Sequence, residues 1–405
     1  MTARARLRTS DSRLVATLSV TTTVSYGVLF YAYGVLLLPI EQDTGWSRTF
    51  LSGAFSAGLL ISALSAVPVG RRLDRHPARP LLLAGAATAV VLLVAWAGAR
   101  DRLTYVGVWL ALGICQAILF YEPAFIVLTK RFHGAARNRA ITNVTLLAGF
   151  ASTIFGPLTA MLEGHLGWRT TVVVLAVVLG AVVVPALLLG LRPASATVAE
   201  VASSPGVMPA AALRTRAFWL LCAAYLLSAI TTFGVAVHLV PFLRDRGTAT
   251  GVAASVLGAI GVVQVLGRAT FIRLSARRPS VHLATWVLAL KATGLALLLA
   301  INGLLGVVLF VVVYGAANGL STLTRATTIG ELYGHEHYGA ISAVIASVTA
   351  VAGALAPFAV AAAADVVGSL TPVLACLAAL TGFAALANEA VAHPTRAARR
   401  ALIST

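Results

Sequence analysis

The chain has 405 residues, of which 59% are hydrophobic and only 11% charged, and its mean hydropathy is +0.92. This composition excludes a soluble globular domain and predicts an all-α integral membrane protein. The formal net charge of +17 does not indicate a nucleic-acid partner, because the basic residues lie in short segments between apolar runs rather than on one soluble face. All the basic residues except Lys130 and Lys291 are arginine, and Ala and Val are abundant, which predicts a GC-rich bacterial source and a plasma-membrane location.

The apolar runs are about as long as the roughly 20 helical residues that cross a bilayer. We expect twelve spans, at 14–39, 50–69, 80–99, 104–128, 141–166, 170–191, 217–243, 252–274, 282–301, 304–324, 338–363 and 370–391. The first run is too long for the core of a signal peptide and no small-residue cleavage site follows a short core, so we expect it to be retained as a span.

Segment 192–216 is rich in Ala, Ser and Pro and predicts a flexible cytoplasmic linker. It separates an N-terminal six-helix bundle at 1–191 from a C-terminal six-helix bundle and basic tail at 217–405. Most of the 30 Arg and Lys residues fall in the two tails, in this linker and in the loops after the second, fourth and eighth spans. This distribution predicts that both termini are cytoplasmic, with the basic tails lying against anionic membrane lipid.

The loop after the second span, Gly70-Arg71-Arg72-Leu73-Asp74-Arg75-His76-Pro77-Ala78-Arg79, carries five charges in ten residues. We expect Gly70 to permit close approach and an unusual backbone angle, and Asp74 to lie near a helix N-terminus or to pair with arginines such as Arg75. Its pattern, Gly-x-x-x-Asp-Arg-x-x-x-Arg, resembles the loop between helices 2 and 3 of the major facilitator superfamily of transporters. A degenerate copy without the acid, Arg273-Leu274-Ser275-Ala276-Arg277-Arg278-Pro279, follows the eighth span, as expected for a repeat of two six-helix bundles.

Four further stretches are similar to that superfamily, and most similar to its monocarboxylate and oxalate/formate branch. They are Gly45-Trp46-Ser47-Arg48, Gly149 through Gly156-Pro157, Gly167-Trp168-Arg169 and Gly267-Arg268. The resemblance implies a secondary active transporter, not an enzyme, that works by alternating access as a monomer. No cofactor is implied, and the chain has no Walker-type Gly-x-x-x-x-Gly-Lys-Ser/Thr motif for ATP.

Ionisable residues inside spans are costly and are therefore candidate functional residues. Arg268 matches an arginine that binds the substrate carboxylate in that branch through paired hydrogen bonds, although an arginine near a span end can also extend to the membrane surface. One turn earlier, Gln264 occupies the place of an acid in the monocarboxylate carriers, and the first span has no lysine where those carriers have one. We consider Gln264, Tyr31 and Tyr33 as further substrate-binding residues; the tyrosines could instead pack.

Glu122 precedes Pro123 in the fourth span, which lines the central cavity in the superfamily. Two roles stay open for it: exchanging a proton as the cavity opens, or forming a lasting ion pair that closes the inward gate. Arg325, at the end of the tenth span, is the proposed partner. Lys291 is expected to form an internal pair, and His238 either lines the cavity or makes a hydrogen bond at the membrane interface.

Cys115, Cys222 and Cys376 lie inside apolar runs and are odd in number, so we expect buried thiols rather than disulfides or a metal site. The leading hypothesis is transport of a small organic anion of monocarboxylate type, with protons as a candidate coupling ion. The alternative is efflux of a drug, a metabolite or a toxic oxyanion. An enzyme acting on lipid-linked substrates would need polar clusters at one membrane face, and segments 41–48 and 163–169 are explained more simply as connectors. The direction of transport is not encoded in these patterns.

Overall fold

The computed structural model describes residues 9–132, 134–191, 208–275, 279–333 and 338–403 of the 405-residue chain. Every secondary-structure element in these ranges is a helix, so the predicted all-α class is confirmed. The chain divides into two compact units, Met1–Ala199 with Thr248–Gly258, and Glu200–Gly247 with Ala259–Thr405. The helix α11 (Thr250–Ser275) therefore begins in the first unit and ends in the second.

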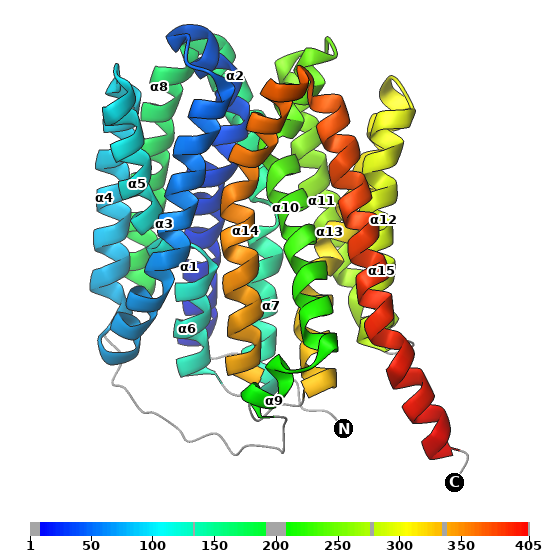
Figure 1. Ribbon diagram of the computed structural model, residues 1–405. Coiled ribbons are helices and arrows are strands. Elements are labelled where there is room, and N and C mark those ends of the chain that lie inside the picture. The colour runs from blue at the N-terminus through cyan, green and yellow to red at the C-terminus, as the bar shows by residue number, and fades with distance from the viewer. Residues whose placement is uncertain (1–8, 133, 192–207, 276–278, 334–337, 404–405) are drawn as a thin grey trace. The chain divides into compact units, whose positions relative to one another are not determined.

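The first unit contains nine helical elements along the N-terminal half of the chain (Figure 1). They are α1 (Thr9–Tyr26), η1 (Gly27–Tyr31), α2 (Ala32–Thr44), α3 (Arg48–Arg75), α4 (Ala78–Gly98), α5 (Arg102–Leu119), α6 (Tyr121–Arg131), α7 (Gly134–Ala148) and α8 (Ala151–Gly190). Within this unit α5 packs against α3 and α4, while α8 packs against α1 and α4.

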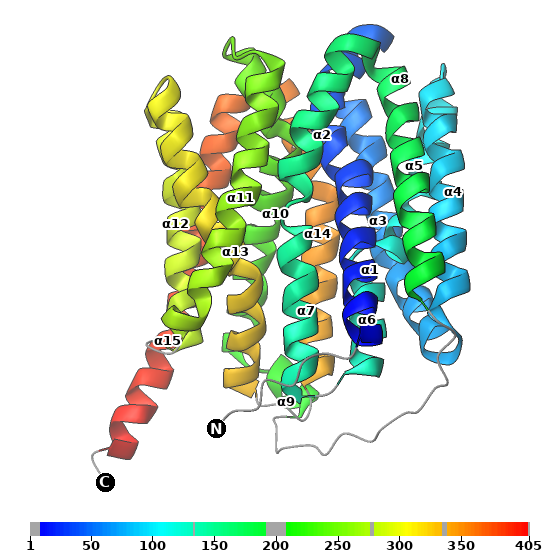
Figure 2. The same ribbon diagram turned by 180° about the vertical axis from the view of Figure 1, so that it is seen from behind.

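The second unit begins with a short helix and continues through long ones. They are α9 (Pro209–Leu213), α10 (Arg216–Asp245), α11 (Thr250–Ser275), α12 (Ser280–Ala300), α13 (Leu304–Tyr333), α14 (Tyr338–Val367) and α15 (Leu370–Ile403). Helix α12 lies beside α13 (Figure 2) and also packs against α15, while α10 packs against α14 and α15.

Eleven helical segments of the described chain are long and apolar enough to cross a membrane. One of them, Arg139–Gly190, has 52 residues and contains Gly167 at φ 72° and ψ 163°, a non-helical backbone geometry that ends one span and begins the next. Counted in this way, the chain has the predicted twelve spans. The expected boundary at residues 302–303 is confirmed, because α12 ends at Ala300 and α13 begins at Leu304.

The Gly-Trp-Ser-Arg motif forms the turn between α2 and α3. Gly45 adopts a left-handed conformation with φ 67° and ends α2, and Ser47 begins α3 by accepting a hydrogen bond from the Phe50 backbone N–H at 3.2 Å. The Arg48 side chain closes the turn through an ion pair with Glu41 at 2.9 Å. These contacts give the motif a structural role.

The Gly167-Trp168-Arg169 motif begins at the helix break and contacts α2 and the end of α4. The indole N–H of Trp168 donates to Asp43 at 2.9 Å. Arg169 donates to the carbonyl oxygens of Ala97 and Ala99 at the end of α4. An arginine at this place satisfies carbonyl groups that a helix end leaves without partners.

The connection between α3 and α4 is shorter than predicted. Since α3 continues to Arg75 and α4 begins at Ala78, only two residues lie outside helices. The unusual backbone angle expected at Gly70 is wrong, because Gly70 is helical and a Cβ there would meet only Ile126, at 3.7 Å. Arg75 is exposed, and the side chain of Asp74 lies outside the described residues.

The end of α6 holds two neighbouring helices in place. Lys130 donates from Nζ to the carbonyl oxygen of Leu73, near the end of α3, at 2.5 Å. Arg131 forms an ion pair with Asp11 of α1 at 2.9 Å. Basic residues that end the fourth span therefore connect it to the first two spans.

The structure describes only the last part of the predicted linker 192–216. Residues 192–207 lie outside the described residues, while the rest of the segment contains α9, whose Ala212 is fully buried against Phe218 and Tyr333. The flexible linker was therefore a wrong expectation for 209–213. The buried-thiol prediction is confirmed for Cys115 and Cys222 and is wrong for Cys376, which is exposed.

Candidate functional site

The first span changes helix type in its middle. Residues Gly27–Tyr31 form a π-helical turn, η1, between α1 and α2. Such turns are rare and often mark functional positions. Gly27 allows this turn to approach α8 closely, because any Cβ there would overlap the Phe155 ring.

The fourth span is interrupted beside that turn. Helix α5 ends at Leu119, Phe120 is extended at φ −80° and ψ −159°, and α6 begins at Tyr121. The ring of Phe120 stacks on Tyr26, with 3.9 Å between centroids, and the Tyr121 ring lies 4.7 Å from Tyr26. The residue before the π-helical turn and the interruption of the fourth span are therefore in contact through aromatic rings. In other membrane transporters, interrupted helices of this kind form binding sites.

Glu122 occupies the first turn of α6, directly after this interruption. Its side chain is exposed although it lies inside the span Arg102–Arg131, and it is near enough to Tyr26 for an electrostatic interaction. The N-terminus of a helix favours a negative charge. Tyr31 is half-buried at the end of η1, with its ring 5.2 Å from the Phe30 ring.

Tyr33 does not join this group. Its side chain is fully buried, stacked 4.2 Å from the Phe55 ring and packed edge-on against Trp109 at 4.9 Å. The expectation that Tyr33 contacts substrate is corrected to its alternative, packing in the aromatic core. The π-helical turn Gly27–Tyr31 lies between Tyr26 and Tyr33 and changes the angular spacing of an α-helix, so the two rings have different surroundings.

In the second unit, α11 and α13 cross closely at small residues. A Cβ at Gly319 would overlap the backbone carbonyl of Gln264, and a Cβ at Gly267 would lie 2.6 Å from the Ala316 carbonyl oxygen. Gly315 and Gly319 are four residues apart, the spacing with which small residues let membrane helices approach. The crossing fixes the backbone of α11 near Arg268.

Arg268 and Gln264 are one turn apart and therefore share a face of α11. The side chain of Gln264 is 7% exposed, and that of Arg268 is half-buried. Gln264 lies inside the span Thr250–Arg268, and Arg268 is its last residue, on a helix that continues to Ser275. Their role in binding substrate stays a prediction.

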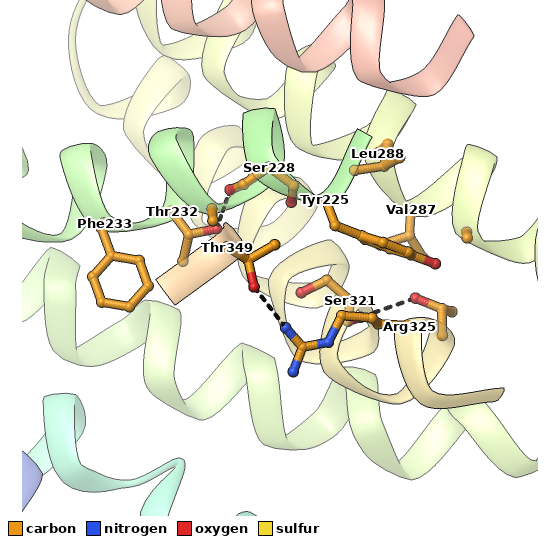
Figure 3. A pocket seen from close by; sticks show the side chains of 12 residues that line it. Tyr225, Ser228, Thr232, Phe233, Val287, Leu288, Ser321, Arg325 and Thr349 are labelled. Carbon is orange, nitrogen blue, oxygen red and sulfur yellow. Dashed lines mark hydrogen bonds between the residues drawn. The ribbon is translucent and has the colours of Figure 1, made fainter. Parts of the chain in front are cut away.

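A cavity of about 160 Å³ lies inside the second unit, between α10, α12, α13 and α14 (Figure 3). Its polar lining residues are Tyr225, Ser228, Thr232, Ser321, Thr324, Arg325 and Thr349. Arg325 points toward Thr349, and its guanidinium donates to Thr349 Oγ1 at 3.5 Å, the outer limit of a hydrogen bond. No acidic residue is among the lining residues that the structure describes.

The hydroxyl residues of this cavity were missed in the sequence. Their signal is polar residues repeating at one-turn spacing within apolar spans, as at Ser228 and Thr232. His238 was expected to line a cavity or to lie at the interface, but it is fully buried and bonds to the carbonyl oxygen of Pro357 at 2.8 Å. It joins α10 to α14 instead.

The described residues contain no cluster of three His, Cys, Asp or Glu side chains placed to hold a metal ion. Glu122 lies in the first unit and Arg325 in the second, so their pairing stays a prediction.

Comparison with known proteins gives a consistent family match. Residues 18–357 match the family described as the Major Facilitator Superfamily. Monocarboxylate transporter 13 of Bos taurus is 28% identical over 317 residues, covering 76% of this chain and 72% of the relative. Monocarboxylate transporter 11 of Homo sapiens is 30% identical and Monocarboxylate transporter 4 of Rattus norvegicus is 26% identical, each over 246 residues. The chain spans 48% of the length of each of these last two relatives and is itself covered to 56%.

A solved structure has the same fold. It is described as a bacterial homolog of the human lysosomal transporter Spinster, in an inward-facing and unoccupied conformation. The TM-score is 0.73 with 96% of each chain covered, and the sequences are 15% identical. At this identity the similarity shows the fold alone.

Proposed function

The chain belongs to the Major Facilitator Superfamily, and we propose that this membrane transporter moves a small organic anion of monocarboxylate type by alternating access. Membership makes it a transporter of a small molecule rather than an enzyme. The finer proposal is supported by the curated monocarboxylate relatives and by the chemistry of its intramembrane arginines.

Arg268 is the observation that carries this proposal. It lies inside a span, where a charged side chain persists only beside water or a partner. The guanidinium presents five N–H donors in a planar fork that matches the two oxygens of a carboxylate. Because Gly267 and Gly319 hold α11 against α13, the fork is attached to a fixed backbone and would bind an anion with little loss of backbone entropy.

We further propose Glu122 as the proton-coupling group. Its carboxyl is exposed at the start of α6, beside the interrupted backbone and the Tyr26 ring. Protonation would neutralise it when the surroundings become dry, and the start of α6 would favour ionisation when water enters. The gating pair with Arg325 is the other role to be tested, and Tyr31 is retained as a candidate substrate contact.

The proposed setting is a bacterial plasma membrane, with a monomer as the functional unit and both termini in the cytoplasm. This orientation is supported by the concentration of arginine in the two tails and in the loops that follow even-numbered spans. Labelling of single cysteines introduced at Arg13 and Asp101 by an impermeant thiol reagent would test the orientation, because these residues are expected on opposite sides.

Uptake by proteoliposomes tests the substrate class. Purified protein should accumulate acetate, lactate or pyruvate under an applied pH gradient, while acetamide and lactamide should not enter through it. The amides are the matched control, because they keep the shape and lose the negative charge. Equal uptake of the acids and their amides, or no uptake of any acid, would reject the anion proposal.

Efflux of an amphipathic compound is a second candidate, favoured by the aromatic rings around Glu122. Tyr26 and Phe120 are stacked, and Tyr121 stacks on Phe125 with centroids 5.5 Å apart. Such rings and a carboxylate would suit an aromatic cation. Cells lacking the protein should then lose tolerance to at least one compound of a broad panel, and unchanged tolerance across the panel would reject efflux.

A further inference from the structure

Lys291 is a buried basic side chain whose described contacts are all with neutral groups. Its side chain is 0% exposed on α12. The ammonium group donates to Ser228 Oγ at 3.1 Å and to Thr232 Oγ1 at 2.6 Å, and it lies 5.6 Å from the Tyr314 ring centroid. Within the described ranges Lys291 has no carboxylate partner. A buried ammonium without a counter-charge is costly, so the charge calls for an anion nearby.

The two hydroxyls that hold Lys291 also line the cavity described above. Figure 3 shows Ser228 and Thr232 on one wall and Arg325 reaching in from another. Lys291 thus lies directly behind the wall that faces the guanidinium. Two basic side chains therefore flank one cavity, and its described lining contains no acid.

The hydrogen bonds leave specific donors for a ligand. The Thr232 hydroxyl donates to the Ser228 carbonyl oxygen at 2.7 Å, and the Thr324 and Thr349 hydroxyls donate within their own helices. Ser228 Oγ accepts from Lys291, and in the described part of the chain its own hydrogen has no acceptor. Arg325 makes one hydrogen bond there, at 3.5 Å, so most of its five N–H donors are also available.

The size of the cavity limits the occupant. A volume of 160 Å³ is several times the roughly 10–15 Å³ that one water needs, so the cavity has room for a small molecule of a few non-hydrogen atoms. Val287, Leu288 and Phe233 cover the rest of the wall and suit a weakly hydrated or short-chain anion. Arg325 is the cationic side chain among the described lining residues, so direct contact matches one unit of negative charge.

We propose that this cavity binds one small monovalent anion at a site separate from Arg268. Arg325 contacts the anion directly, Ser228 donates its hydroxyl hydrogen to it, and Lys291 contributes its charge through the Ser228 and Thr232 hydroxyls. No described lining residue comes from α11, and Arg268 is not among the lining residues. The anion is either inorganic, such as chloride or nitrate, or a short carboxylate.

Thermal stability of the purified full chain tests the site. Sodium gluconate keeps ionic strength constant and supplies an anion too large for the cavity, and chloride, nitrate, acetate or lactate replaces it stepwise. A saturable rise in the unfolding temperature is expected with at least one of them. Saturation by chloride or nitrate identifies an inorganic occupant, and saturation by the carboxylates alone that persists in Arg268→Gln identifies an organic one.

Single-residue variants test which side chains contribute to anion binding in the cavity. Lys291→Met keeps side-chain length and removes the charge, and Arg325→Gln removes the guanidinium; each should raise the anion dissociation constant by about tenfold or more, the equivalent of one lost charge-assisted contact. The exposed Arg216→Gln should bind as the wild type does. In an Arg268→Gln background, which removes the proposed carboxylate contact on α11, a saturable response should remain, and that response reports the cavity. If Lys291→Met does not fold, Ser228→Ala, which removes the free donor, takes its place.

Three results would overturn the proposal: no saturable response to any of the four anions, wild-type affinity in both cavity variants, or loss of every saturable response in Arg268→Gln. Failure of carboxylate uptake with intact anion binding would reject the transport proposal and leave this one standing. Loss of binding in the cavity variants with carboxylate uptake intact would support the separation of the two sites.

Discussion

The side-chain amide of Gln116 donates a hydrogen bond to the carbonyl oxygen of Leu29 at 3.1 Å, inside the π-helical turn of the first span. Gln116 is fully buried on α5, so this bond connects the first and fourth spans in surroundings without water. A π-helical turn misaligns carbonyl groups relative to an α-helix, and the amide satisfies one of them. The irregular backbone next to Glu122 is therefore supported by a specific side chain.

Replacing Gln116 by leucine should destabilise the first unit by roughly 1–3 kcal/mol, because the buried Leu29 carbonyl loses its donor. The unfolding temperature of the purified protein in detergent measures the effect. Gln116→Glu, which keeps the shape and lacks the NH₂ group, is the matched comparison and should also be destabilised. Wild-type stability in both variants would show that the bond does not support the turn.

The crossing of α11 and α13 predicts a contrast between two glycines. Gly319→Ala should destabilise the protein and reduce transport, because the new Cβ would overlap the Gln264 carbonyl and move α11. Gly382→Ala, on α15, has open space around the added Cβ and should stabilise by about 0.5–1 kcal/mol through helix propensity. Equal effects at the two positions would contradict the close crossing.

The two roles proposed for Glu122 make different predictions. As a proton-coupling group, Glu122→Gln should keep exchange of substrate across the membrane and lose accumulation driven by a pH gradient. As half of a gate with Arg325, the same variant should impair exchange as well. The exchanged pair, Glu122→Arg with Arg325→Glu, should then recover exchange that each single variant lacks.

Asp101, outside the spans, predicts a pH dependence of stability. The carboxylate of Asp101 accepts hydrogen bonds from the Thr104 backbone N–H at 2.8 Å and from the Thr104 hydroxyl at 2.7 Å. These bonds, the backbone one most strongly, lower the pKa of Asp101 below its ordinary value. The carboxylate therefore adds stability above about pH 3.9, the ordinary pKa, and this is lost as pH falls through the lowered value. Asp101→Ala should lower the unfolding temperature at neutral pH, and the difference from the wild type should shrink in acid.

The apolar runs and punctuating glycines were sufficient to predict most of the fold. Spans stand out in the sequence as apolar runs because hydrocarbon requires apolar side chains along the whole helix. Gly167 marked the break between two spans that otherwise form one continuous helix. The interruption at Phe120 was missed, since the span was expected to be continuous, although Pro123 two residues into α6 was a local signal.

The candidate site was harder to predict because it depends on how helices rotate against one another. Sequence spacing could identify Arg268, Glu122 and Arg325 as costly groups within spans, but not their neighbours. Lys291 was expected to form an internal pair, and its partners proved to be hydroxyls on a helix about sixty residues earlier in the chain. The choice between substrate contact and packing for Tyr33 could not be made from sequence, because the π-helical turn before it changes the angular spacing along the first span.

Uptake of labelled lactate by proteoliposomes containing the wild type, Arg268→Gln, Arg268→Lys or Arg216→Gln tests the central claim most directly. Arg268→Gln should lose uptake, Arg268→Lys should retain a small part of it because lysine keeps the charge without the planar fork, and the exposed Arg216→Gln should match the wild type. A folded Arg268→Gln protein that accumulates lactate at the wild-type rate would contradict the account.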